Sequence, residues 1–260
     1  MGFSRATAGL CALFCLLGAA RGAAAANLYL TPQIGFLGGF IDAKGRTQTS
    51  PLQDIGGKNS DWSPGGGLAI GIAVPMDEIA PFDVGLPDWE IRFEIESITT
   101  ADDLEFNVDG CCANLPVRMS LETVTTSFGL WFDFPVTDGV SALIGRRVPF
   151  FDPVSFTLGG GPGFVRNDLS LKHADETRSQ EVLNFAWQVG AGFGYQLTPN
   201  LTLTATYRYM DQGRIEATPC CVTPTASDTF RADPSQHDVL VGARILFYGV
   251  PSPHRWYGRW

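Results

Sequence analysis

Charged residues that alternate with apolar ones are the side chains best placed to do chemistry in this sequence of 260 residues. Within 89–96, the odd positions are all apolar and the even positions are all charged, which is typical of a strand with two unlike faces. The polar faces of two later alternating segments carry an arginine each. We expect these groups to converge inside one sheet: Glu90, Arg92, Glu94, Glu96, Arg208 and Arg244.

Three acids and three bases balance in this set. Charged groups stay buried only when they are paired and hydrogen-bonded, because desolvation costs several kcal/mol per ion. We therefore predict a structural plug of salt bridges. A gated polar path through such a plug is the alternative.

Histidine offers the second kind of chemistry. Ser235, His237 and Asp238 lie close in sequence, but neighbours on a strand point to opposite faces, and a catalytic triad is assembled by geometry. His173 stands in a polar segment and His254 near the C-terminus. We predict no catalytic residue, no cofactor and no metal site. A lipid-modifying enzyme stays open as an alternative, and would need a histidine that faces a serine at the membrane rim.

Cysteine occurs in two adjacent pairs outside the first 26 residues, and zinc-ligand spacing with nearby histidines is absent from the sequence. Adjacent cysteines rarely bond to each other, because the geometry is strained. The hypothesis is that disulfides join two polar loops; a local bond or no bond is the alternative. The residues concerned are Cys111, Cys112, Cys220 and Cys221.

The elements that must position these residues are strands. Eight segments show period-two alternation, and an open sheet edge would leave backbone groups unpaired in lipid. The sequence therefore predicts an all-β fold, a single antiparallel up-and-down barrel of eight strands, each about as long as a tilted membrane-spanning strand. The segments are Leu28–Ile41, Gly67–Val74, Trp89–Ser97, Thr123–Phe134, Val154–Gly159, Phe185–Leu197, Leu201–Met210 and Val239–Phe247. An extra strand within Val140–Phe150 would make ten.

The connectors alternate in character. Four are polar and are expected to face the outside: Asp42–Ser63, Asp102–Arg118, Ser170–Glu181 and Asp211–Gln236. Those between them would face the periplasm. Aromatic residues gather near the strand ends, as in the girdles of membrane barrels.

Residues 1–26 have the layout of a secretory signal peptide: a positive start, a short apolar core and small residues at the cleavage positions. The domains predicted are this signal peptide, a barrel over 27–248 and a C-terminal tail over 249–260. Removing Arg5 and Arg21 changes the formal charge from −9 to −11. A protein so acidic is a poor nucleic-acid binder.

Three stretches carry a resemblance to a known family: the hairpin 195–209 with its Leu-Thr-Pro-Asn turn, the last strand 237–247, and the glycine-rich run 159–164. They resemble small outer-membrane barrels such as the OmpA transmembrane domain and the opacity-type proteins. The resemblance implies the Gram-negative outer membrane, with lipid, lipopolysaccharide and the barrel assembly machinery as partners. We expect a non-enzymatic protein that contributes to envelope integrity and presents loops for surface interaction or adhesion, with a host or surface ligand. A small-solute, porin-like channel is the alternative.

Overall fold

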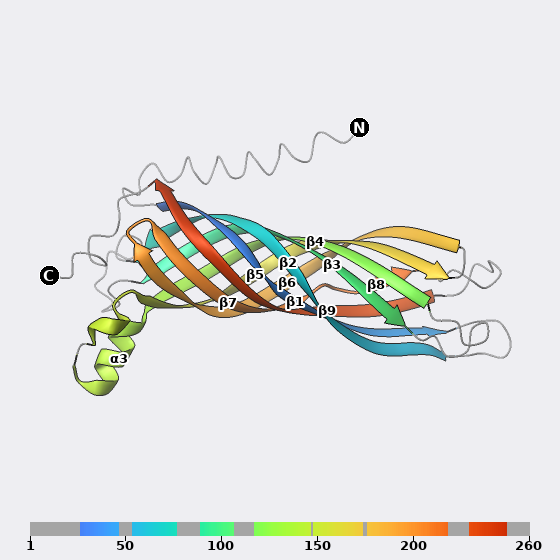
Figure 1. The fold of residues 1–260 in the computed structure, drawn as a ribbon, viewed down its shortest axis with the longest axis horizontal. Helices are drawn as coiled ribbons and strands as arrows, with labels where there is room; N and C mark the ends of the chain where they lie inside the picture. The colour runs from blue at the N-terminus through green and yellow to red at the C-terminus, as the bar shows by residue number, and fades with distance from the viewer. Residues whose placement is uncertain are drawn as a thin grey trace.

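The computed structural model describes residues 27–46, 54–76, 89–106, 117–146, 148–173, 176–217 and 229–248 (Figure 1). The predicted signal peptide, the predicted tail and all four cysteines of the two pairs lie outside these residues. The hypotheses about cleavage and disulfides stay predictions.

The chain forms a closed antiparallel barrel. Strands β1 to β7 each pair with the next one, β7 pairs with β9, and β9 pairs with β1, so that the ring closes on itself. The strands are β1 Asn27–Arg46, β2 Asp54–Pro75, β3 Glu90–Phe106, β4 Val117–Pro135, β5 Val154–His173, β6 Glu176–Thr198, β7 Leu201–Asp211, β8 Ile215–Ala217 and β9 Thr229–Tyr248.

The ring has eight strand positions, as predicted. The three-residue strand β8 pairs with β9 just beyond the last residue that β7 pairs, so it continues β7 rather than adding a ninth position. Gly213 lies in the short break between β7 and β8 and has a φ of 70°, a backbone conformation that favours glycine.

Alternation separates an apolar outer face from a polar inner face. In β6, Phe185, Trp187 and Val189 are exposed, whereas the intervening Ala186 and Gln188 are buried. The same pattern runs through the other strands, so large apolar side chains on the outside of the barrel are exposed in the part of the chain that the structure describes. Such a surface suits lipid rather than water.

Aromatic rings mark the two borders of this apolar band. At the end of the barrel that carries Asn27 and Tyr248, rings touch across neighbouring strands: Trp89, Phe134, Phe156 and Phe193, with centroids 4.3 to 6.3 Å apart along the row. Toward the opposite end, but well inside it, a second row surrounds His237: Phe40, Tyr207, Tyr209 and Trp187. We call these the near girdle and the far girdle, and the corresponding barrel ends the near end and the far end.

The strands are longer than predicted. β1 has 20 residues and β4 has 19, which at about 3.3 Å per residue and a tilt of about 45° gives roughly 45 Å along the barrel axis. An outer-membrane band needs only about 25 Å. The excess lies at the far end, where much of the sequence assigned to polar loops is strand: 42–46 and 54–63 form a continuous ladder. Those loop boundaries were wrong.

The alternative of ten strands is also wrong. The connector that follows β4 holds helix α3, Val136–Ile144, and a short 3-10 helix η2, Pro149–Phe151, instead of an extra strand. Figure 1 shows α3 at the near end, displaced to one side of the barrel. Among the described residues, no helix combines the length and apolar character that a transmembrane helix requires.

Candidate functional site: a charged network inside the barrel

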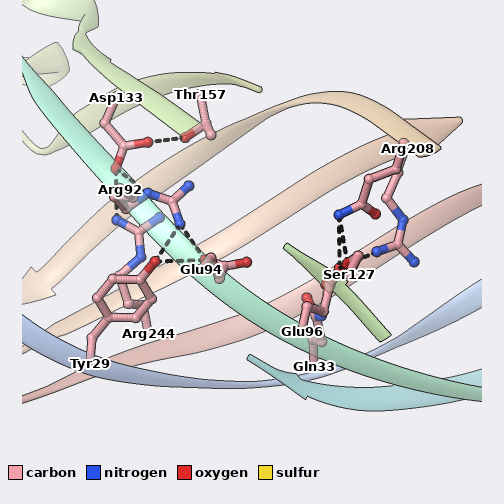
Figure 2. Close-up of polar contacts among 11 residues, drawn as sticks. Tyr29, Gln33, Arg92, Glu94, Glu96, Ser127, Asp133, Thr157, Arg208 and Arg244 are labelled. Atoms are coloured by element: carbon pink, nitrogen blue, oxygen red, sulfur yellow. Dashed lines mark hydrogen bonds and ion pairs between the residues drawn. The ribbon is translucent and has the colours of Figure 1, made fainter. Parts of the chain in front are cut away.

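The inner face brings distant charged residues together in two clusters along β3 (Figure 2). This follows from the alternation of β3, whose even positions point inward and meet side chains from strands across the lumen. Arg92 and Glu94 join the cluster nearer the near end, and Glu96 joins the other.

The first cluster centres on Arg92 and Asp133. Arg92 Nε lies 3.1 Å from Asp133 Oδ2, and Arg244 Nη1 lies 2.8 Å from the same oxygen. Thr157 Oγ1 donates to Asp133 Oδ1 at 2.6 Å. Two guanidinium groups and a hydroxyl therefore hold this fully buried carboxylate, which desolvation would otherwise make costly.

Tyr29 and Glu94 complete the first cluster. Arg92 Nη1 donates to Glu94 Oε2 at 2.7 Å, and Tyr29 Oη donates to the same oxygen at 2.7 Å. The Arg92 guanidinium carbon lies 5.7 Å from the centre of the Tyr29 ring, and that of Arg244 lies 5.4 Å from it. Both cations thus contact an aromatic face as well as carboxylates.

The second cluster centres on Arg208, one of the most deeply buried side chains described. Its Nε donates to Asp238 Oδ2 at 2.8 Å, and its Nη1 donates to Glu96 Oε2. Gln33 donates to the other oxygen of Glu96. Gln188 Nε2 donates to Ser127 Oγ at 2.8 Å and extends the network across the lumen.

Five of the six predicted charges lie in these clusters. Glu90, the first residue of β3, is only half-buried, whereas Asp133 and Asp238 are fully buried and were not counted among the predicted charges. Asp133 occupies an inward position of the segment Thr123–Phe134, and Asp238 immediately precedes the segment Val239–Phe247, so the alternation extended by one residue would have found both. The clustered groups are therefore three guanidiniums and four carboxylates, one negative charge more than a balanced set.

A small polar pocket separates the two clusters. It has a volume of about 30 Å³ and is lined by Arg92, Glu94, Glu96, Arg208 and Arg244 among others. That is room for about two water molecules. An eight-stranded barrel has an interior just wide enough for side chains to fill, and here charged side chains and the Trp131 indole fill it.

Inward glycines make space for the large inner rings. A Cβ on Gly129 would lie 2.3 Å from Nε1 of Trp131, and one on Gly71 would lie 2.4 Å from the Tyr29 hydroxyl. Trp131 in turn places its ring 5.8 Å from the Arg92 guanidinium carbon. The small residues thus permit the aromatic packing that backs the first cluster.

The residues weighed for catalysis are divided between the two faces of β9, since Ser235 and His237 occupy outward positions and Asp238 an inward one. His237 lies on the outer face, where its Nδ1 is 2.6 Å from Tyr207 Oη, whereas Asp238 points inward to Arg208. His173 ends β5, opposite Glu176 in the register, and His254 lies outside the described residues. In the described part of the chain, no group of three or more histidine, cysteine, aspartate or glutamate side chains could hold a metal ion.

Comparison with known structures finds outer-membrane barrels that share little sequence with this chain. OprG of Pseudomonas aeruginosa is 12% identical with a TM-score of 0.48, and Neisserial surface protein A is 14% identical with a TM-score of 0.40. The outer membrane protease OmpT of Escherichia coli is 11% identical with a TM-score of 0.39. Each similarity covers 85% of this chain and 97% of the other.

No curated protein matches the chain significantly. A family model described as "Outer membrane protein beta-barrel domain" matches residues 10–244, which is most of the sequence. The closed ring, the apolar outer face and the girdles agree with that match. The chain therefore belongs to the outer membrane protein beta-barrel domain family.

Proposed function

We propose that this outer-membrane protein is a non-enzymatic surface barrel that contributes to envelope integrity and presents its far-end loops for interaction or adhesion. The observation that carries the proposal is the length of the strands. A barrel that needs about 25 Å to cross the membrane continues as paired strands well beyond the far girdle.

Charges on the outside of this extension support a position above the lipid. Arg166 pairs with Asp168 at 3.1 Å and with Glu181 at 3.0 Å, and Arg231 pairs with Glu216 at 3.2 Å. These side chains are about half exposed, and each exposed pair is worth at most about 1 kcal/mol. They mark a wall in contact with water, on which loops would stand clear of the membrane surface.

The interior supports a closed barrel rather than an enzyme or an open pore. Ion pairs fill the lumen between the girdles, and His237 is turned away from Asp238. For such a barrel the partners are outer-membrane lipid and lipopolysaccharide around the band, the barrel assembly machinery during insertion, and a host or surface ligand at the loops.

Loop replacement separates the two roles. Residues 107–116 and 218–228 would be exchanged for glycine-serine linkers of equal length. A strain that lacks the gene would then be complemented with either the unaltered or the loop-replaced form. We expect the loop-replaced barrel to restore the detergent resistance of the cells. We do not expect it to restore cell-to-cell aggregation or attachment to coated surfaces. Full attachment by the loop-replaced form would overturn the proposed loop role.

A small-solute channel is the second candidate, favoured by the polar pocket between the two clusters. It requires the ion pairs to open, since the pocket holds only about two waters. Conductance across a planar bilayer distinguishes the two candidates, because a closed barrel is silent there and a channel is not.

A further inference from the structure

Among the residues that the structure describes, none covers the strongly apolar surface of helix α3 at the near end. Leu143 is 87% exposed, Ile144 is 53% exposed and Phe150 in η2 is 75% exposed. Val136, Val140, Leu143 and Ile144 follow the spacing i, i+4, i+7 and i+8, so they share one face of the helix. Single apolar residues scattered on a surface are normal. An exposed apolar helix face together with the exposed ring of Phe150 forms a continuous patch, and such a patch marks a site of interaction.

The helix is too short to be stable alone. It has nine residues, and isolated helices below about 12 residues are marginal in water. Thr137 Oγ1 donates to Asp152 Oδ1 at 3.1 Å, which ties the start of the helix to the end of the connector. Gly145, with a φ of 74°, follows its last turn. The hydrogen bond holds the start of the helix and Gly145 ends it, while the apolar face stays uncovered by any part of the chain that the structure describes.

The position of the helix next to the near girdle indicates that lipid covers this face. β4 ends at Pro135, immediately after Phe134, whose ring contacts Trp89 at 4.3 Å and Phe156 at 6.3 Å. The helix thus begins at the border where the apolar band meets the membrane interface, and Figure 1 shows it to the side of the barrel. Arg146 is exposed just after the apolar stripe, where it would meet lipid phosphates.

We propose that α3 and η2, within residues 136–146 and 148–151, form an interfacial anchor that lies in the headgroup region of the periplasmic leaflet, with Leu143, Ile144 and Phe150 in the acyl boundary. Its ligand is a phospholipid surface. The anchor would fix the depth and tilt of the barrel, because a short helix beside the wall resists rotation of the barrel about an axis in the membrane plane.

Photo-crosslinking of the full barrel in vesicles of phosphatidylethanolamine and phosphatidylglycerol tests this. The photoreactive residue p-benzoylphenylalanine would replace Leu143 or Phe150, and as a control Lys58, whose side chain is 84% exposed at the far end. We expect phospholipid adducts by mass spectrometry at 143 and 150, at least tenfold above those at 58. Equal yields at all three positions would overturn the anchor.

The same variants in isolated outer membranes distinguish a lipid from a protein partner. Adducts between two copies of the chain, or with another envelope protein, in place of lipid adducts would assign the face to a protein interface and overturn the proposal. The variant L143S/F150S should fold into the same barrel, judged by gel mobility without heating. Amide exchange over 136–146 should then be at least tenfold faster, and unchanged exchange would count against the anchor.

Discussion

Arg208 is the residue on which the second cluster depends. Its replacement by methionine keeps most of the volume but leaves Glu96 and Asp238 buried without their cation. We expect Arg208→Met to lower the free energy of unfolding by about 3–5 kcal/mol, because an uncompensated buried charge is costly. Urea unfolding of the barrel in vesicles measures this.

Arg231 offers the matched control for this change. It pairs with Glu216, but both side chains are more than half exposed. Arg231→Met should cost at most about 1 kcal/mol, since surface pairs contribute little. If the two variants lost the same stability, the charges around Arg208 would not be desolvated, and the plug would be an ordinary hydrated cluster.

Gly129 tests the packing behind the first cluster. A side chain there would meet the Trp131 indole, which lies against Arg92. We expect Gly129→Val to destabilise the barrel by about 1–3 kcal/mol, the usual cost of overpacking. In Gly139→Val, on α3, the new side chain meets none of the described residues, since a Cβ at that position has no neighbour among them within 4 Å. A Gly129→Val variant as stable as the Gly139→Val variant in urea would show that Trp131 moves aside freely.

Among the elements, the far-end hairpin of β1 and β2 makes a prediction of its own. Residues 36–46 and 54–64 form an unbroken ladder of partners, although most of this stretch has the composition of a polar loop. Paired backbone amides exchange slowly even above a membrane, because opening must precede exchange. We expect these amides to exchange at least a hundredfold slower than in the urea-unfolded chain, by mass spectrometry of peptic fragments. Rates equal to those of the unfolded chain would restore the loop interpretation.

The strands show what sequence reasoning can and cannot reach. Alternation predicted the eight strand positions because lipid on one side and a filled lumen on the other impose opposite polarity on successive residues. Above the membrane both faces meet water or polar groups, so alternation fades, as in Gly56, Gly57, Asn59 and Ser60. Strand ends there depend on pairing with a neighbour, which period alone does not report.

Sequence reasoning predicted the candidate site in part, as it did the strands. Inward charges on β3, β7 and β9 followed from the alternation, but their partners did not. Asp133 pairs with residues far away in sequence, and the contact depends on the stagger of strands across the closed ring. Helix α3 was missed because nine residues with a few apolar positions are also consistent with a short strand.

At the scale of the whole molecule, two clusters of ion pairs stacked along the lumen decide whether the barrel conducts. They lie between the girdles, with Asp133 on the near side and Asp238 beside the far girdle residue His237. Ions that cross the barrel must therefore pass both clusters in turn, with a pocket of about 30 Å³ between them. Removing one cluster leaves the other in place.

The wild-type barrel should therefore be silent in a planar bilayer, or nearly so. Arg92→Ala and Arg208→Ala together open both clusters, and we expect discrete conductance steps that prefer cations, because four carboxylates then line the lumen with one guanidinium. Each single variant should conduct at least tenfold less than the double variant, since one cluster still blocks the path. Frequent large conductance steps from wild-type protein, shown to be folded by its gel mobility, would instead establish an open channel. That result would contradict the proposal that the charged clusters close the lumen.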